Sequence, residues 1–112
     1  MDVARKSEPM IKNLDPQEVA RLLKQDAIVL VDVRESDEYA AQHIPGAHLV
    51  PLSSFDPSSL PESGGRTIVL HCQAGGRSAK ALALCQGAGV AVDSHLKGGI
   101  LAWMAAGLPV ER

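Results

Sequence analysis

The sequence predicts an α/β fold in which helices cover both faces of a parallel β-sheet. Two nearly continuous apolar runs, residues 27–33 and 67–72, are rich in β-branched residues, which is typical of strands buried on both faces. Segments with the apolar spacing of helices precede and follow these runs. Strands that alternate with helices pair in parallel through right-handed crossovers, so the helices come to lie on both sides of the sheet.

The first elements follow a polar stretch, Met1–Met10, which we expect to be a flexible leader. A helix is then expected to run to about Gln25. Asp15 is its predicted N-cap, Pro16 occupies the first helical position, and Glu18 is the expected capping-box partner. The first apolar run follows directly and is the first predicted strand.

Short elements are expected in the middle of the chain. Ser36 is the predicted cap of a short helix that continues through Gln42. A turn at residues 44–47 then leads into a short strand at residues 48–50. Residues 51–65 contain three prolines, and we expect short helical turns and loop there.

The C-terminal half of the chain repeats the order of strand and helix twice. Its predicted elements are a strand, a helix, a further strand and a last helix, at residues 67–72, 78–86, 89–96 and 99–106. The first of these helices is expected to end at Gly87 or Gly89, and the last before Gly107 and Pro109. With no internal repeat, we expect residues 1–112 to form a single domain.

Composition excludes several classes of function. A formal charge of −2, without a basic run, gives no reason to expect nucleic-acid binding. The apolar, uncharged stretch at residues 98–110 is too short to cross a bilayer, so no membrane partner is expected. Two cysteines are too few for a disulfide scaffold, and the N-terminus has no signal-peptide core. We therefore expect a soluble, cytoplasmic protein, while its oligomeric state stays open.

The loop after the second apolar run carries the chemistry. In sheets of this kind, sites form where strands end and loops lead into helices, and Cys72 stands at such a point. Gly75 and Gly76 allow the backbone to curl, so that the N–H groups of residues 73–78 point at the sulfur. A helix N-terminus binds anions and favours thiolate over thiol. The sequence therefore predicts a nucleophilic cysteine at the floor of an anion pocket, with a pKa below the value of about 8.5 for free cysteine.

The remaining loop residues and the end of the first strand supply candidates for binding and support. Arg77 offers planar, bidentate donors to oxyanions. Asp32 is expected either to hydrogen-bond near the loop or pair with an arginine, or to cap a helix or turn. Arg34 is expected either to reach the anion pocket or to form a structural salt bridge. The candidate substrate-binding residues are Gln73, Ala74, Gly75, Gly76, Arg77 and Ser78.

Other potentially reactive residues have structural interpretations. Cys85 has the helical spacing of a core residue, although a redox role stays open. The four histidines show no metal-ligand spacing, so no metal is expected. Adjacent residues in a strand point to opposite faces, so His71 is expected under the sheet, and a dyad with Cys72 is disfavoured. Trp103, the only tryptophan, is expected to be buried.

Three motifs, in order, resemble those of the rhodanese-type sulfurtransferases. The loop Cys-Gln-Ala-Gly-Gly-Arg-Ser at residues 72–78 is similar to that family's active-site loop, which runs from a cysteine over four residues to a basic residue. Val-Asp-Val-Arg at residues 31–34, with Glu38-Tyr39 and residues 43–47, resembles the N-terminal signature of the family. Residues 98–103 and 107–110 resemble the C-terminal one.

The resemblance implies a fold and a reaction. It implies a single rhodanese domain with a central parallel sheet of about five strands. It also implies that the Cys72 thiolate takes the outer sulfur of thiosulfate or a similar anionic donor as a persulfide, and passes it to cyanide, a small thiol or a protein acceptor. Arg77 would attract the donor, and no cofactor would be needed. Asp32 and Arg34 are candidate supporting residues on the separate ground of their position at the end of the first predicted strand.

Three alternatives remain. Phosphatases and arsenate reductases also place a thiolate and an arginine in a curled anion loop. Theirs is one residue longer than the four residues that separate Cys72 and Arg77, and the shorter loop suits a sulfur atom better than a phosphate. A regulatory module on a rhodanese fold, or a persulfide carrier that acts with a protein partner, would retain the same loop.

Overall fold

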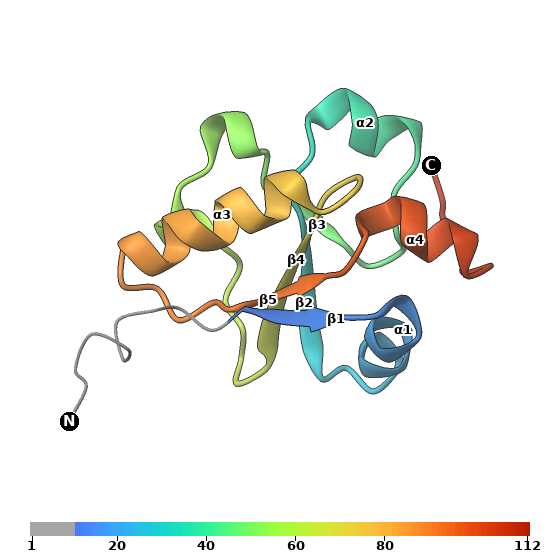
Figure 1. Cartoon of the computed structure of the whole chain (residues 1–112), viewed down its shortest axis with the longest axis horizontal. Helices are drawn as coiled ribbons and strands as arrows, with labels where there is room; N and C mark the ends of the chain where they lie inside the picture. The colour runs from blue at the N-terminus through green and yellow to red at the C-terminus, as the bar shows by residue number, and fades with distance from the viewer. Residues whose placement is uncertain (1–10) are drawn as a thin grey trace.

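A five-stranded parallel sheet runs through the middle of the fold, in the order β1-β5-β4-β2-β3 (Figure 1). The computed structural model describes residues 11–112, and the expected leader, Met1–Met10, lies outside the described residues. The strands are β1 (Lys12–Leu14), β2 (Ile28–Asp32), β3 (His48–Leu49), β4 (Thr67–His71) and β5 (Ser94–Leu96). The predicted α/β class and the parallel pairing are confirmed.

Helices lie on both faces of this sheet. They are α1 (Pro16–Lys24), α2 (Ser36–Ala41), α3 (Gly76–Gly87) and α4 (Gly99–Ala105), with 3-10 turns η2 (Leu52–Ser54) and η3 (Pro57–Ser59). Alternate residues of β2 point to opposite faces, because side chains of a strand alternate. Ile28 and Leu30 join the core under α1 and α4, whereas Val29 and Val31 join the core under α3.

The N-terminal elements depart from expectation at three points. β1 was not predicted: its three residues are exposed or half-buried, and an edge strand without an apolar run gives no periodic signal. At α1, the Asp15 carboxylate accepts from the Glu18 N–H at 2.9 Å, as predicted. The Glu18 side chain, however, faces Arg21 at 3.9 Å. At α2 the N-cap is Glu35, and Ser36 is already helical.

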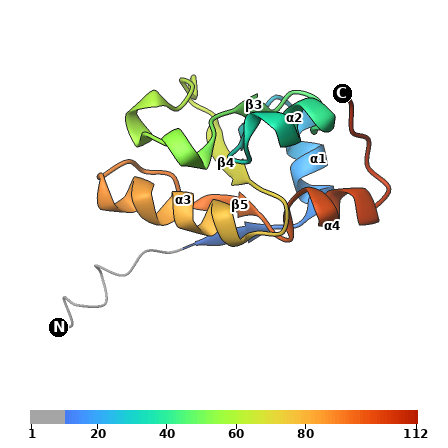
Figure 2. The same ribbon diagram turned by 90° about the horizontal axis from the view of Figure 1, so that it is seen from above.

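The C-terminal half brings segments that are far apart in sequence to one edge of the sheet. Figure 2 shows the start of α3 beside the end of β4 and the start of α4. α3 begins at Gly76, two residues earlier than expected, with Gly75 as its N-cap. Gly89, at φ +74°, follows the C-cap Ala88, so the second of the two predicted terminators is the one used.

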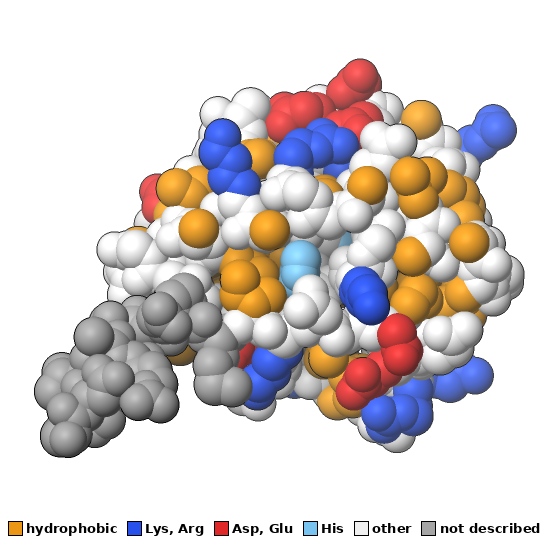
Figure 3. Space-filling model, viewed as in Figure 1, with side chains coloured by type: hydrophobic (Ala, Val, Ile, Leu, Met, Phe, Trp, Pro, Cys, Tyr) orange, Lys and Arg blue, Asp and Glu red, His pale blue; other side chains and the backbone are white. Residues whose placement is uncertain are grey.

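One side of the fold has a cavity that lies away from the Cys72 loop. Apolar side chains gather on the right of Figure 3, over the part of the molecule where Figure 1 draws α4. A cavity of about 600 Å³ lies there between α1 and the C-terminal residues, and Leu23, Trp103 and Pro109 are among its lining side chains. None of its lining residues belongs to the Cys72 loop. Of the helices within residues 11–112, none combines the length and the hydropathy needed to cross a bilayer.

Candidate active site

Cys72 directly follows β4, at the edge where the parallel strands end. The next turn of backbone is held from two directions. The Ile100 N–H donates to the Cys72 carbonyl at 2.9 Å, and the Leu101 N–H donates to the Gln73 carbonyl at 3.1 Å. On the other side, Gly75 adopts φ +117° and so turns the chain sharply into α3. Only glycine adopts this conformation readily, which explains the glycine at this position.

The close contact between α4 and the loop depends on Gly98 and Gly99. Both have a positive φ, +76° and +62° respectively. A Cβ atom on Gly99 would overlap the carbonyl oxygens of Cys72 and Gln73. The glycine pair of the C-terminal motif therefore lets the start of α4 donate its N–H groups to the loop that carries the cysteine.

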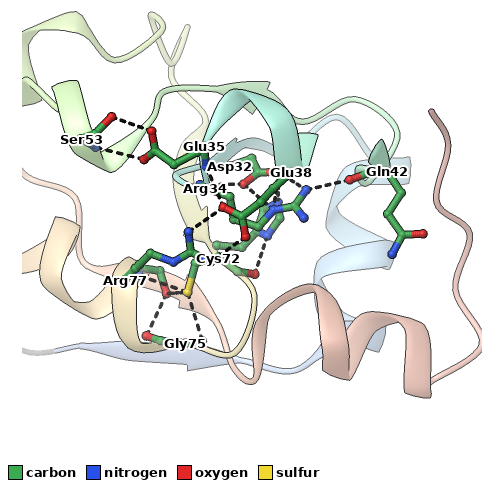
Figure 4. A network of polar contacts seen from close by, with 11 residues as sticks. Asp32, Arg34, Glu35, Glu38, Gln42, Ser53, Cys72, Gly75 and Arg77 are labelled. Atoms are coloured by element: carbon green, nitrogen blue, oxygen red, sulfur yellow. Dashed lines mark hydrogen bonds and ion pairs between the residues drawn. The ribbon is translucent and has the colours of Figure 1, made fainter. Parts of the chain in front are cut away.

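The Cys72 sulfur receives several hydrogen bonds. The Gly75 N–H donates to Sγ at 3.1 Å and the Ser78 N–H at 3.3 Å, and the Ser78 hydroxyl lies 3.6 Å from it (Figure 4). Burial disfavours the charged form, but the donors of Ser78, Gly75 and Ala74 outweigh it and lower the pKa of the Cys72 thiol. The side chain is 1% exposed, so it is enclosed more completely than the expected pocket floor.

The loop residues predicted to bind substrate surround the sulfur unequally. Gly75 and Ser78 donate to it directly, and Ala74 contributes to its lowered pKa. Gln73 lies in the loop and Gly76 begins α3; both residues are exposed, and neither forms a hydrogen bond to Sγ.

Arg77 is held by the carboxylate of Glu38, which was not among the predicted site residues. Its guanidinium donates twice to Glu38, at 2.7 Å and 2.9 Å. Glu38 also accepts from the Glu35 N–H at 2.9 Å, and the hydrogen bonds from Arg77 are the main reason that its pKa falls to about 2. Glu35 in turn accepts from Ser53 (Figure 4). Glu38 lies in the N-terminal motif, which is the one sequence signal that pointed to it.

Asp32 and Arg34 form a buried ion pair. The Arg34 Nη2 lies 2.7 Å from the Asp32 carboxylate, and it also donates to the Gln42 carbonyl at 2.8 Å. Asp32 also accepts from the Arg34 N–H at 2.9 Å. None of these hydrogen bonds reaches residues 73–78. Of the alternatives left open, the structure has Asp32 pairing with an arginine and Arg34 in a structural salt bridge, which ties the end of β2 to the end of α2.

His71 and Cys85 are both fully buried. His71 Nδ1 lies 3.1 Å from the Cys72 carbonyl oxygen, and Nε2 lies 3.6 Å from Asp32, so the ring does not contact the sulfur. Cys85 packs in the core under α3, where burial raises the pKa of its thiol. Trp103 is buried as predicted and donates from its indole to the Pro109 carbonyl at 2.8 Å.

Two polar residues of the site, Asn13 and His95, were not predicted from the sequence to lie there. The Ser78 Oγ lies 2.8 Å from His95 Nδ1, and His95 Nε2 lies 2.7 Å from the Asn13 Oδ1. Asn13 and His95 belong to the two short strands β1 and β5, which pair with each other. Within residues 11–112, no three His, Cys, Asp or Glu side chains gather in a way that could hold a metal ion.

Comparisons with known proteins agree with this geometry. The model of the family described as rhodanese-like domain matches residues 15–106. A sulfurtransferase of Allochromatium vinosum is 34% identical over 107 residues, which cover 90% of this chain and 95% of that protein. An uncharacterised protein of Synechocystis is 49% identical over 97 residues, which are 87% of this chain but 54% of that relative.

A solved structure shows the same arrangement of chain. The crystal structure of a thiosulfate sulfurtransferase from Pseudomonas aeruginosa superposes with a TM-score of 0.73 at 32% identity. The match covers 92% of this chain and 20% of that one. This chain is thus similar to one part of a larger protein in that case, and to nearly the whole of the Allochromatium protein.

Proposed function

The chain belongs to the rhodanese-like domain family, and from this premise we propose that it is a sulfurtransferase that works through a persulfide on Cys72. The donor is thiosulfate or a similar sulfane compound, and the acceptor is thiophilic, such as cyanide or a thiol. One observation carries the proposal. The Cys72 sulfur is the shared acceptor of backbone N–H groups at the start of a helix, where an anion is stabilised.

The reaction has two displacement steps. In the first, the Cys72 thiolate attacks the outer sulfur of thiosulfate, the sulfur–sulfur bond of the donor breaks, and sulfite leaves with the electron pair. In the second, the acceptor attacks the outer sulfur of the persulfide and Cys72 leaves as a thiolate. The N–H groups of Gly75 and Ser78 stabilise the thiolate of Cys72 before the first step and as it leaves in the second, while in the persulfide the negative charge is on the outer sulfur. Such covalent catalysis gives ping-pong kinetics.

Substrate access requires movement of the loop, because the Cys72 side chain is 1% exposed. The loop is anchored where it begins, by the donors from Ile100 and Leu101. Ala74, between this anchor and the N-cap Gly75, is exposed and forms the outer part of the loop. We infer that the donor approaches over this outer part.

One observation favours a second candidate function, a persulfide carrier that acts with a protein partner. Arg77 is the only basic residue in the loop, and both of its terminal nitrogens are bonded to Glu38. The loop therefore offers little net positive charge to a small dianion such as thiosulfate. A persulfide delivered by a protein carries at most one negative charge and would depend less on that positive charge.

Mass spectrometry after treatment with thiosulfate tests the proposed function. We expect the mass of one added sulfur atom on the peptide that contains Cys72, and its loss as thiocyanate when cyanide is added. Cys72→Ser is the matched control and should gain no sulfur. If p-nitrophenyl phosphate is hydrolysed and no thiocyanate forms, a phosphatase replaces this proposal. If the persulfide forms but passes only to a purified acceptor protein, the carrier is correct.

A further inference from the structure

A series of hydrogen bonds connects the Cys72 sulfur to the far edge of the sheet. From Sγ, the Ser78 Oγ lies at 3.6 Å, and His95 Nδ1 lies a further 2.8 Å from that hydroxyl. The Asn13 Oδ1 then lies 2.7 Å from His95 Nε2. We call these four residues the proton path. Ser78 is fully buried and His95 is 7% exposed, so the hydroxyl and the ring are shielded from bulk water, whereas Asn13 is exposed.

The orientation of Asn13 sets the direction of the bonds, because its Oδ1 and not its Nδ2 faces the ring. A carbonyl oxygen only accepts, so His95 must hold a proton on Nε2. In the neutral ring Nδ1 is then an acceptor, and it takes the proton of the Ser78 hydroxyl. The hydroxyl also lies 3.1 Å from the Gly75 carbonyl, but the distance to His95 is shorter. The hydroxyl oxygen is left to accept from the Cys72 thiol.

This direction suits the thiol and not the thiolate. While the Ser78 proton points at His95, it cannot stabilise a negative sulfur. We propose that the thiol proton of Cys72 passes through the Ser78 hydroxyl to Nδ1 of His95, so that the thiolate forms together with an imidazolium held by Asn13. Part of this inference rests on the proposed function, namely that Cys72 reacts as a thiolate.

The transfer balances without a co-reactant. The Sγ–H bond breaks and an O–H bond forms at Ser78, while the original hydroxyl proton moves to Nδ1 of His95. No electrons are exchanged. All three bonds of the proton path survive, since the imidazolium now donates to the hydroxyl and the hydroxyl donates to the sulfur. His95 is thus a positioning residue and proton acceptor that acts through Ser78.

The surroundings of the ring keep it neutral before the transfer. His95 meets Ser78 from α3 and Asn13 from β1, and its partner in register on β4 is the apolar Leu70. In the part of the chain that the structure describes, no carboxylate lies within 4.0 Å of its nitrogens. Burial lowers the pKa of His95, so the ring is neutral at neutral pH, and it takes up a proton only together with the negative charge that forms on Cys72.

Two further ionisable groups face the site but lie outside the proton path. Arg77 interacts with the charge of Cys72, and its own charge is balanced by Glu38. His71 bonds to the Cys72 carbonyl oxygen and not to the sulfur. The charge of neither group depends on His95, so both stay constant in the comparison below.

The pH dependence of Cys72 alkylation tests the inference in the full chain, with the modification quantified on the Cys72 peptide. In His95→Leu the midpoint should rise by about one pH unit, since the paired imidazolium is lost. In Asn13→Asp it should fall, because a carboxylate makes the ring a stronger proton acceptor. His48→Gln replaces an exposed histidine and should match the wild type. A midpoint that stays or falls in His95→Leu, or does not fall in Asn13→Asp, overturns the inference.

Because Ser78 lies between Cys72 and His95 in the proton path, a double variant gives a second test. Ser78→Ala keeps the N–H donor but removes the hydroxyl, so adding His95→Leu to it should have no further effect. Should His95→Leu fail to fold, the ring titration of His95 by NMR in the natural sequence and in Cys72→Ala replaces it. The His95 pKa should be lower in Cys72→Ala, because the two groups titrate as a pair. Equal values overturn the inference.

The two proposals fail separately. Alkylation and NMR titration need no sulfur donor, so they report on the proton path alone. If the alkylation profiles of the variants shift as expected but no persulfide forms, the sulfurtransferase proposal fails and the proton path stands. Persulfide formation with an unchanged His95→Leu profile would do the reverse.

Discussion

The two cysteines of this protein are equally buried and chemically opposite. Cys72 is 1% exposed and Cys85 is 0% exposed. Cys85 belongs to α3 and packs among apolar side chains of the core, and burial raises the pKa of its thiol. Burial opposes ionisation of Cys72 as well, but the donors of Ser78 and Gly75 reverse the direction of the shift. Enclosure alone therefore does not decide reactivity; the orientation of nearby N–H groups does.

The largest expected effect separates the two sulfurs directly. Cys72→Ser should abolish persulfide formation, because a hydroxyl is a poor acceptor of sulfane sulfur, and it should leave the fold intact. Cys85→Ser should retain sulfur transfer and lose stability instead, since it buries an unpaired hydroxyl in the apolar core. Thiocyanate formation and thermal unfolding measure the two outcomes. Equal loss of activity in both variants would contradict the comparison.

A smaller effect is expected when the loop loses its outside support. Gly99→Ala places a Cβ against the Cys72 and Gln73 carbonyls at a positive φ, so it should destabilise the fold by about 1–3 kcal/mol. The donors should also move off the sulfur, which would raise the Cys72 pKa toward that of Cys85.

Gly87→Ala is the matched control for this change. Gly87 lies in the last turn of α3, where nothing approaches a Cβ, and its φ is not positive. Urea unfolding and Cys72 alkylation against pH give the two readouts. Unchanged alkylation in Gly99→Ala would show that the loop holds its shape without α4.

Donor preference should respond next. Glu38→Gln frees the Arg77 guanidinium, so the KM for thiosulfate should fall by up to about tenfold. Arg77→Ala should raise the KM for thiosulfate and have little effect with a neutral organic trisulfide. Steady-state kinetics with both donors measure this. A rise in the thiosulfate KM for Glu38→Gln would mean that the ion pair itself forms the donor site.

The smallest effect concerns stability in acid. The folded pKa of Glu38 is about 2, below its ordinary value of 4.5, so its contribution to stability is present above 4.5 and is lost as the pH falls toward 2. Because the pair is partly exposed, this contribution is about 1 kcal/mol or less. Urea unfolding of Glu38→Gln should show a deficit that shrinks across this interval. A deficit that does not change with pH would contradict the ion pair as its source.

The sequence predicted the elements and contacts that depend on residues close together in the chain. β2 and β4 are continuous apolar runs, and the donors of Gly75 and Ser78 follow from a strand, two glycines and a helix in direct succession. The partners that complete the site come from far along the chain. Glu38 and Arg77 are 39 residues apart, and Asn13 and His95 are 82 apart. The periodic spacing of apolar residues in the sequence does not predict contacts between residues so far apart.

Two errors have local causes. α3 was predicted to begin at Ser78, but the left-handed Gly75 is its N-cap and the helix begins at Gly76. β1 was missed because an edge strand of three residues carries no apolar alternation. Both residues concerned, Gly75 and Asn13, contact the site, so the least regular segments are also the ones that shape it.

The donors that α4 contributes make the Cys72 loop depend on a segment that is synthesised later. Cys72 and Gln73 leave the ribosome well before Ile100 and Leu101, whose N–H groups anchor their carbonyls. Until α4 docks, the loop lacks this support. The loop that carries the sulfur is therefore completed by a segment that lies almost thirty residues further along the chain.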